Sequence, residues 1–118
     1  MPIWPKFVDA YLEAALWSSM DDEGVPFDRD YDISDFDQES INKAVKESNE
    51  FIMANREDLE KVGNEEQHGH DFWLTRNGHG VGFWDRGYGE VGERLSEAAD
   101  AYGEQHVWAG PNGTVYLE

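Results

Sequence analysis

Hydrophobic positions in the first half of the chain recur at helical spacing. They predict one helix over residues 5–18 and a longer one over about 37–62, because apolar residues three and four apart share one helix face. Ser34 or Asp37 is suited to cap the longer helix, and Gly63 is suited to end it. The apolar stripe of the longer helix consists of Ile41, Ala44, Val45, Phe51, Ile52, Leu59 and Val62. The connection between the two helices, residues 20–39, is strongly acidic.

The second half of the chain has shorter patterns separated by turn residues. Two β-hairpins are predicted, one pairing residues 70–76 with 81–86 and one pairing 104–109 with 114–117, because each pair flanks a turn rich in Gly and Asn. A short helix is predicted between them over 90–102. The expected fold class is therefore α+β. Two N-terminal helices precede a hairpin, a short helix and a second hairpin, and the helices pack on an antiparallel sheet.

Length and composition indicate a single folded domain over residues 1–118. Hydrophobic residues make up 39% of the chain and aromatic residues 14%, which is typical of sequences that fold. There is no apolar run long enough to span a membrane and no signal-peptide pattern at the N-terminus. Cysteine is absent, which excludes disulfides and thiolate metal sites. A cytoplasmic location is the expectation.

Charge is the unusual property of this sequence. Twenty-six Asp and Glu residues against nine Lys and Arg leave a formal net charge of −17. Direct binding to nucleic acid and to anionic membranes is disfavoured, because both surfaces are themselves negative. The expected partner is a basic protein surface, and a homodimer stays open as an alternative assembly.

The charge is concentrated between residues 21 and 39, where nine carboxylates surround a single base, Arg29. These candidate partner-binding residues are Asp21, Asp22, Glu23, Asp28, Asp30, Asp32, Asp35, Asp37 and Glu39. Three hypotheses compete for this segment. The simplest is a solvated loop that leads into a helix N-terminus, where the helix dipole favours negative charge.

The second hypothesis is calcium binding. Asp28, Asp30, Asp32 and Glu39 match the acidic positions of an EF-hand loop. However, Ile33 stands where that loop needs Gly. No metal site is therefore assigned.

The third and favoured hypothesis is that the segment substitutes for DNA. Alternate residues of an extended chain lie about 6.6 Å apart on one face, so Asp28, Asp30 and Asp32 would form a row of anions. That spacing is of the same order as the phosphate spacing of DNA, about 3.4 Å of rise per strand. Such a row could occupy the basic groove of a DNA-binding protein and block it.

A second candidate surface lies on the predicted first hairpin. One face would carry Trp73 and Trp84 beside Arg86, and the same register places Asp71 opposite Arg86 as an ion pair. Exposed Trp beside Arg is typical of binding hot spots, although aromatic residues more often belong to cores. This face supports the alternative function, a structural or assembly protein.

Motifs for catalysis are missing from the sequence. It has no Gly-x-Ser-x-Gly, P-loop or His-Glu-x-x-His pattern, and its carboxylates are too numerous for any one pair to indicate acid–base chemistry. His68, His70 and His79 lack a spacing that completes a zinc site. We therefore expect a binding protein without a cofactor rather than an enzyme.

Three stretches of the sequence resemble a family of small acidic phage-encoded proteins. They are the runs GHDFWLTRNGHGVGFWDRG at 69–87, YLEAALWSSMDDEG at 11–24 and GERLSEAA at 92–99. The resemblance implies a phage origin and no particular reaction. Small acidic phage proteins often disarm host systems whose working surfaces bind DNA. The resemblance therefore favours an inhibitor of a host DNA-binding defence or repair protein, of the anti-restriction or anti-CRISPR type.

Overall fold

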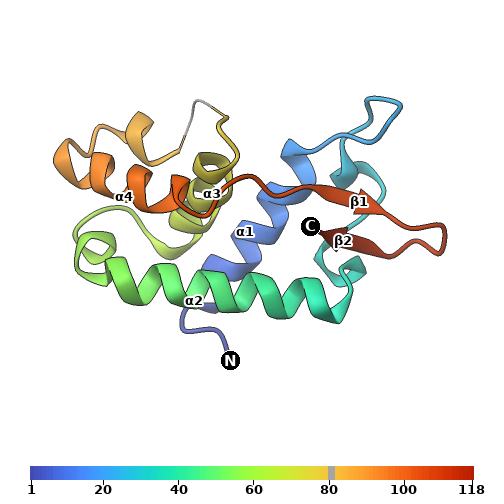
Figure 1. The fold of residues 1–118 in the computed structure, drawn as a ribbon, viewed down its shortest axis with the longest axis horizontal. Helices are drawn as coiled ribbons and strands as arrows, with labels where there is room; N and C mark the ends of the chain where they lie inside the picture. The colour runs from blue at the N-terminus through green and yellow to red at the C-terminus, as the bar shows by residue number, and fades with distance from the viewer. Residues whose placement is uncertain (80–81) are drawn as a thin grey trace.

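Four α-helices dominate the part of the chain that the computed structural model describes, residues 1–79 and 82–118 (Figure 1). The described elements, in order, are α1 (Pro5–Ser18), the 3-10 turns η1 (Phe27–Arg29) and η2 (Ile33–Asp35), α2 (Gln38–Lys61), α3 (Glu65–Arg76), the 3-10 turn η3 (Phe83–Arg86), α4 (Glu90–Asp100), β1 (Val107–Ala109) and β2 (Val115–Leu117). The two strands pair antiparallel, with Trp108 opposite Tyr116.

The predictions for α1, α2, α4 and the C-terminal hairpin are confirmed. Helix α1 has Pro5 in its first turn, where its missing N–H costs no hydrogen bond. Helix α2 begins after Asp37, whose side chain accepts a hydrogen bond from the backbone N–H of Ser40. Gly63 follows the C-cap residue Val62 and has a positive φ of 59°.

The first predicted hairpin is wrong, and so is the α+β class built on two hairpins. Residues 70–76 belong to helix α3, and Phe83–Arg86 form the turn η3. Gly80 and Val81, part of the expected turn and second strand, lie outside the described residues. The only sheet of the described chain is the two-stranded one formed by β1 and β2.

Helix α3 forms because its ends are capped and its centre is buried. The Asn64 side chain accepts a hydrogen bond from the N–H of Gln67, and Glu65 and Glu66 occupy the first turn. Every residue from Asp71 to Arg76 is buried, so the helix has no polar face in its second half. A helix that is buried all round lacks the 3.6-residue pattern that would distinguish it from a strand.

Helix α1 packs closely against α3 in the core. A Cβ atom at Gly69 would overlap the backbone carbonyl of Phe7, so only glycine allows this approach. The rings of Tyr11 and Trp73 meet edge to face at 5.3 Å, and Phe51 of α2 stacks on Phe72 at 4.3 Å. Three helices thus share one aromatic cluster.

The acidic connection and the C-terminal hairpin lie together at one end of the molecule, and α4 and η3 lie at the other (Figure 1). The hairpin contacts the start of α2 directly. Asp37 donates its N–H to the carbonyl of Val115 at 3.0 Å, and Leu117 donates its N–H to Ser40 Oγ at 2.9 Å. The hairpin therefore fixes where the acidic connection ends.

Candidate functional site

Residues 20–39, the acidic segment, are ordered by two buried aromatic residues. Phe27 and Phe36 are both buried in the core. Phe27 sits in η1 and Phe36 directly follows η2, where it forms a parallel bridge with Val115. The carboxylates between these anchors are held on a folded backbone.

The first turn of the segment is stabilised by its own carboxylate. Asp21 Oδ1 accepts hydrogen bonds from the N–H groups of Glu23 and Val25, each at 2.9 Å. A backbone bridge between Met20 and Pro26 closes the turn. Asp21 therefore has a structural role in addition to its charge.

Three further carboxylates cap 3-10 turn η2 and helix α2. Asp32 accepts a hydrogen bond from the N–H of Ser34 at 2.9 Å, and Asp35 accepts one from the N–H of Asp32 at 2.9 Å. Asp37 accepts the N–H of Ser40. Ser34 also donates its hydroxyl to Asp32, and these hydrogen bonds lower the pKa of the Asp32 carboxyl below its ordinary value. Asp32 is accordingly held in its anionic form.

The other five carboxylates of the segment are exposed. Their side chains accept no hydrogen bond from any described residue. They are Asp22, Glu23, Asp28, Asp30 and Glu39. These five residues are consequently available to an external partner.

The expected regular row of anions is wrong. Asp28 lies inside η1, Asp30 follows it in a helical conformation, and Asp32 precedes η2. A 3-10 turn rises only about 2.0 Å per residue and rotates successive side chains, so the even spacing of an extended chain is lost. The fold brings Asp28 and Asp32 to one pocket, and Asp37 and Glu39 to another beside the hairpin.

Counter-charges lie elsewhere in the molecule. Within residues 1–79 and 82–118, each ion pair uses an acid of α2 or α3, and none involves the nine carboxylates at 21–39. The acids that are paired are Glu47, Glu57, Asp58, Glu60 and Asp71. The negative potential of the segment is therefore not neutralised by the described part of the protein.

A pocket of about 320 Å³ lies between α1 and the acidic segment. Trp17 of α1, 43% exposed, and the half-buried Tyr31 line it. Glu13, Asp28 and Asp32 add three carboxylates to the same pocket. Aromatic rings next to carboxylates are suited to organic cations.

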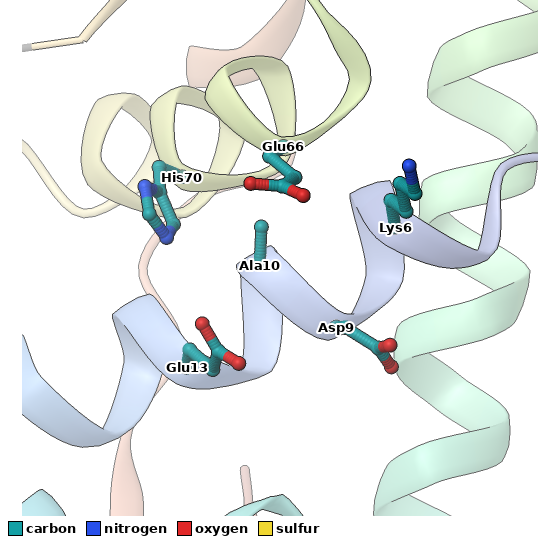
Figure 2. A pocket seen from close by; sticks show the side chains of 6 residues that line it. All are labelled: Lys6, Asp9, Ala10, Glu13, Glu66 and His70. Atoms are coloured by element: carbon teal, nitrogen blue, oxygen red, sulfur yellow. The ribbon is translucent and has the colours of Figure 1, made fainter.

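A second pocket, of about 180 Å³, continues this surface along α1. In Figure 2, His70 and Glu66 project from α3 toward α1, which contributes Glu13 and Lys6. His70 also meets the ring of Trp17 edge to face at 6.4 Å. Because Glu13 lines both pockets, the anionic surface extends beyond the segment identified from the sequence.

The two-tryptophan face is not formed. Trp73 is 1% exposed and donates its indole N–H to Ser18 Oγ at 2.8 Å, whereas Trp84 is 59% exposed. Arg86 pairs with the buried Asp71 through two hydrogen bonds of 2.9 and 3.0 Å. The predicted Asp71–Arg86 ion pair thus exists, but it joins α3 to η3 instead of two strands.

Histidines and acids do not assemble a metal site in the described chain. Among residues 1–79 and 82–118, no group of three or more His, Asp or Glu side chains is placed to hold a metal ion. The Nε2 atom of buried His68 lies 2.6 Å from the Val62 carbonyl oxygen and 2.9 Å from that of Leu59. It therefore provides a hydrogen-bond partner for carbonyl groups at the C-terminal end of α2. The EF-hand match at Asp28 to Glu39 consequently has no corresponding ligand cluster.

Trp17, Tyr31 and Glu13 were not identified as site residues from the sequence, and His70 was considered only for a zinc site. Glu13 and Trp17 are four residues apart on the exposed side of α1, which is a usable signal. Tyr31 carries no such signal, because its position depends on the turns η1 and η2.

Among the described helices, none is long and apolar enough to cross a membrane.

Comparisons with known proteins found no match for this chain among protein-family models, curated proteins or solved structures. The resemblance to phage-encoded proteins therefore stays a prediction.

Proposed function

We propose that this protein binds a basic, DNA-binding host protein through its acidic segment and blocks the surface that contacts DNA. The expected target is a defence or repair protein of a bacterial host, and the expected place of action is the cytoplasm. One observation carries the proposal. Nine carboxylates are concentrated on an ordered segment, and none of them is paired with a base of the described chain.

Order and charge together favour this function over a solvated loop. A loop that served only to connect α1 with α2 would not need Phe27 and Phe36 buried in the core. A pre-ordered anionic surface loses less conformational entropy on binding than a mobile tail. Complementary charge also speeds association, in a manner that salt weakens.

The test removes charge without removing capping hydrogen bonds. The segment variant carries Asp22→Asn, Glu23→Gln, Asp28→Asn and Asp30→Asn. The helix variant carries Glu93→Gln, Glu97→Gln, Asp100→Asn and Glu104→Gln. Both variants lose four charges, and the second set is exposed on and just after α4, at the far end of the molecule (Figure 1).

Each protein is immobilised and exposed to a bacterial lysate, and retained proteins are identified by mass spectrometry. We expect a DNA-binding protein to be retained by wild type and by the helix variant and to be lost with the segment variant. The purified target should then release duplex DNA in a gel-shift assay when wild type is added. Equal retention by both variants, no specific retention, or a target that keeps its DNA would contradict the proposal.

A further inference from the structure

We propose that the pocket between α1 and the acidic segment binds an arginine side chain of the basic partner. The pocket is the one lined by Trp17 and Tyr31. The inference deepens the proposed function and rests on it for the identity of the partner, but the pocket chemistry can be tested without that partner. Carboxylates alone would not define a site. The argument depends on the combination of a pocket, two aromatic rings that are at least partly exposed and carboxylates without an ion-pair partner.

The size of the pocket suits a single side chain. Its volume of about 320 Å³ is at the lower end of the range for ligand pockets, about 300–1,000 Å³. Leu16 and Ile33 contribute aliphatic surface between the aromatic rings and the carboxylates. A guest with an aliphatic stem and a charged end would match both parts of this lining.

The charge of the lining selects a cation. Glu13, Asp28 and Asp32 line the pocket, and no basic residue is among its described lining. A neutral apolar guest would remove water from these carboxylates and return no hydrogen bond. A small metal ion would leave the aromatic rings unused, and no metal-binding group is present among the described residues.

Arginine fits this lining better than lysine does. Its planar guanidinium stacks on aromatic faces, pairs with carboxylates through two hydrogen bonds and is weakly hydrated. The ammonium of lysine is compact and strongly hydrated, so it gains less from a ring at the side of a pocket.

The protein already surrounds one of its own arginines in this way. The Arg76 guanidinium carbon lies 5.4 Å from the Tyr102 ring centroid and 5.7 Å from that of Phe72. The same guanidinium donates a hydrogen bond to Glu47 at 2.9 Å. The surface pocket offers the same types of group, aromatic rings from Trp17 and Tyr31 and nearby carboxylates. No arginine of the described chain is among its lining residues.

The test follows the indole N–H signals of the protein by two-dimensional NMR as a peptide is added. The probe is N-acetyl-Gly-Arg-Gly-amide, and the lysine and all-glycine tripeptides serve as matched controls. Trp17→Phe assigns the Trp17 signal by removing it. The exposed Trp84, in η3 at the far end, reports non-specific binding, and the buried Trp73 reports that the fold is intact.

We expect the arginine peptide to shift the Trp17 signal in a saturable manner, the lysine peptide to bind more weakly, and the glycine peptide to cause no shift. The double variant Asp28→Asn, Asp32→Asn should weaken binding of the arginine peptide about two- to fivefold or more. The Asp32→Asn change keeps an oxygen that can accept the Ser34 N–H, so the turn is preserved. Trp17→Ala, followed through the shifted backbone amides, should weaken binding about two- to fivefold.

The inference is overturned if the lysine peptide binds as well as the arginine peptide. Shifts centred on Trp84, or shifts that persist unchanged in the double variant, would also overturn it. Failure of the proposed function looks different. In that case the tripeptide still binds at Trp17 while no DNA-binding protein is retained from lysate. Conversely, a retained target with no arginine preference at the pocket would remove this inference alone.

Discussion

The two ends of this molecule use their charges in different ways. At the end formed by α3, η3 and α4, two arginines are paired with acids, Arg86 with Asp71 and Arg94 with Asp58. No ion-pair partner in the described chain is found for three exposed acids of α4, Glu93, Glu97 and Asp100. At the end formed by the acidic segment and the hairpin, acids cap backbone N–H groups or face outward. Ion pairs within the fold are therefore found at the first end, whereas at the second end nine carboxylates lie close together in the sequence with no ion pair in the described chain. Residues 21–39 hold nine acids and one base, so this short segment alone carries −8 of the net charge of −17.

The largest effect is expected from Arg76, where charge is used inside the fold. Arg76 is buried and donates to Glu47, to the hydroxyl of Tyr11 and to the carbonyls of Tyr102 and Gly103. Burial raises the pKa of the Tyr11 phenol, so it stays neutral beside the guanidinium. Arg76→Met should lower the free energy of unfolding by about 3–5 kcal/mol, measured by urea denaturation.

Arg56→Met is the matched control for this change. Arg56 pairs with Glu60 on the exposed side of α2, and both side chains are more than half exposed. Its loss should cost less than about 1 kcal/mol. Similar losses of unfolding free energy in the two variants would show that burial does not determine how much an ion pair contributes to stability.

A medium effect on stability is expected at Asp37, which caps α2. Comparison with Asp28 tests whether capping acids stabilise the fold and outward-facing acids do not. Asp37→Ala leaves the Ser40 N–H without its partner at the start of α2 and should cost about 1 kcal/mol in urea denaturation. Asp37→Asn should stay near wild type, because Asn caps as well as Asp. Asp28→Ala, which removes no hydrogen bond of the described structure, should cost nothing. Equal losses at Asp37 and Asp28 would contradict this division.

A smaller effect, dependent on pH, is expected at the Asp58–Arg94 pair. Arg94 donates two hydrogen bonds of 2.8 Å to Asp58, and these lower the pKa of the Asp58 carboxyl. A carboxyl with a lowered folded-state pKa stabilises the protein above its unfolded pKa and loses that contribution as pH falls through the folded value.

Arg94→Met should therefore lower the thermal midpoint near pH 7, and the difference from wild type should disappear as pH falls below about 4. Asp58→Asn should cause a similar loss near pH 7, and the double variant should lose little more than either single one. A pH-independent difference would mean that Arg94 acts through packing alone.

The smallest effect is expected from the segment variant itself. Removing four unpaired charges should raise the thermal midpoint slightly at low salt, because self-repulsion falls. The helix variant should gain less, since Arg94 belongs to α4 and offsets part of its negative charge. In about 1 M salt, where the screening length is about 3 Å, both gains should disappear. A larger rise of the thermal midpoint in the helix variant would contradict this prediction, because it would mean that charge repulsion is strongest at α4.

The amphipathic helices could be predicted from the sequence, whereas the buried one could not. Helices α1 and α2 have a polar face and defined ends at Pro5 and Asp37. In α3 the apolar residues Phe72, Trp73 and Leu74 are consecutive, a run that periodicity alone cannot assign to a helix or a strand, and its helical state depends on burial against α1. Local sequence cannot report that contact.

The candidate site, like the fold, could be predicted only in part from the sequence. The carboxylates are visible in the sequence, but their grouping depends on two short 3-10 turns that no periodic pattern marks. Glu13 and Tyr31 share a pocket only because the chain folds back over α1 at Phe27. The sequence therefore identifies the charge, and the fold identifies the pocket.

The link between the hairpin and the start of α2 has a consequence for synthesis of the protein. Leu117 donates to Ser40 across 77 residues of chain, so the acidic segment is translated long before the strand that secures it. At about 5–20 residues per second, that interval is roughly 4–15 s. During this time a ribosome-bound chain carries the carboxylates on an unanchored connection. If the acidic segment is the binding surface proposed above, binding should begin only after β2 has been made, and this delay sets the earliest moment at which a newly translated copy can bind.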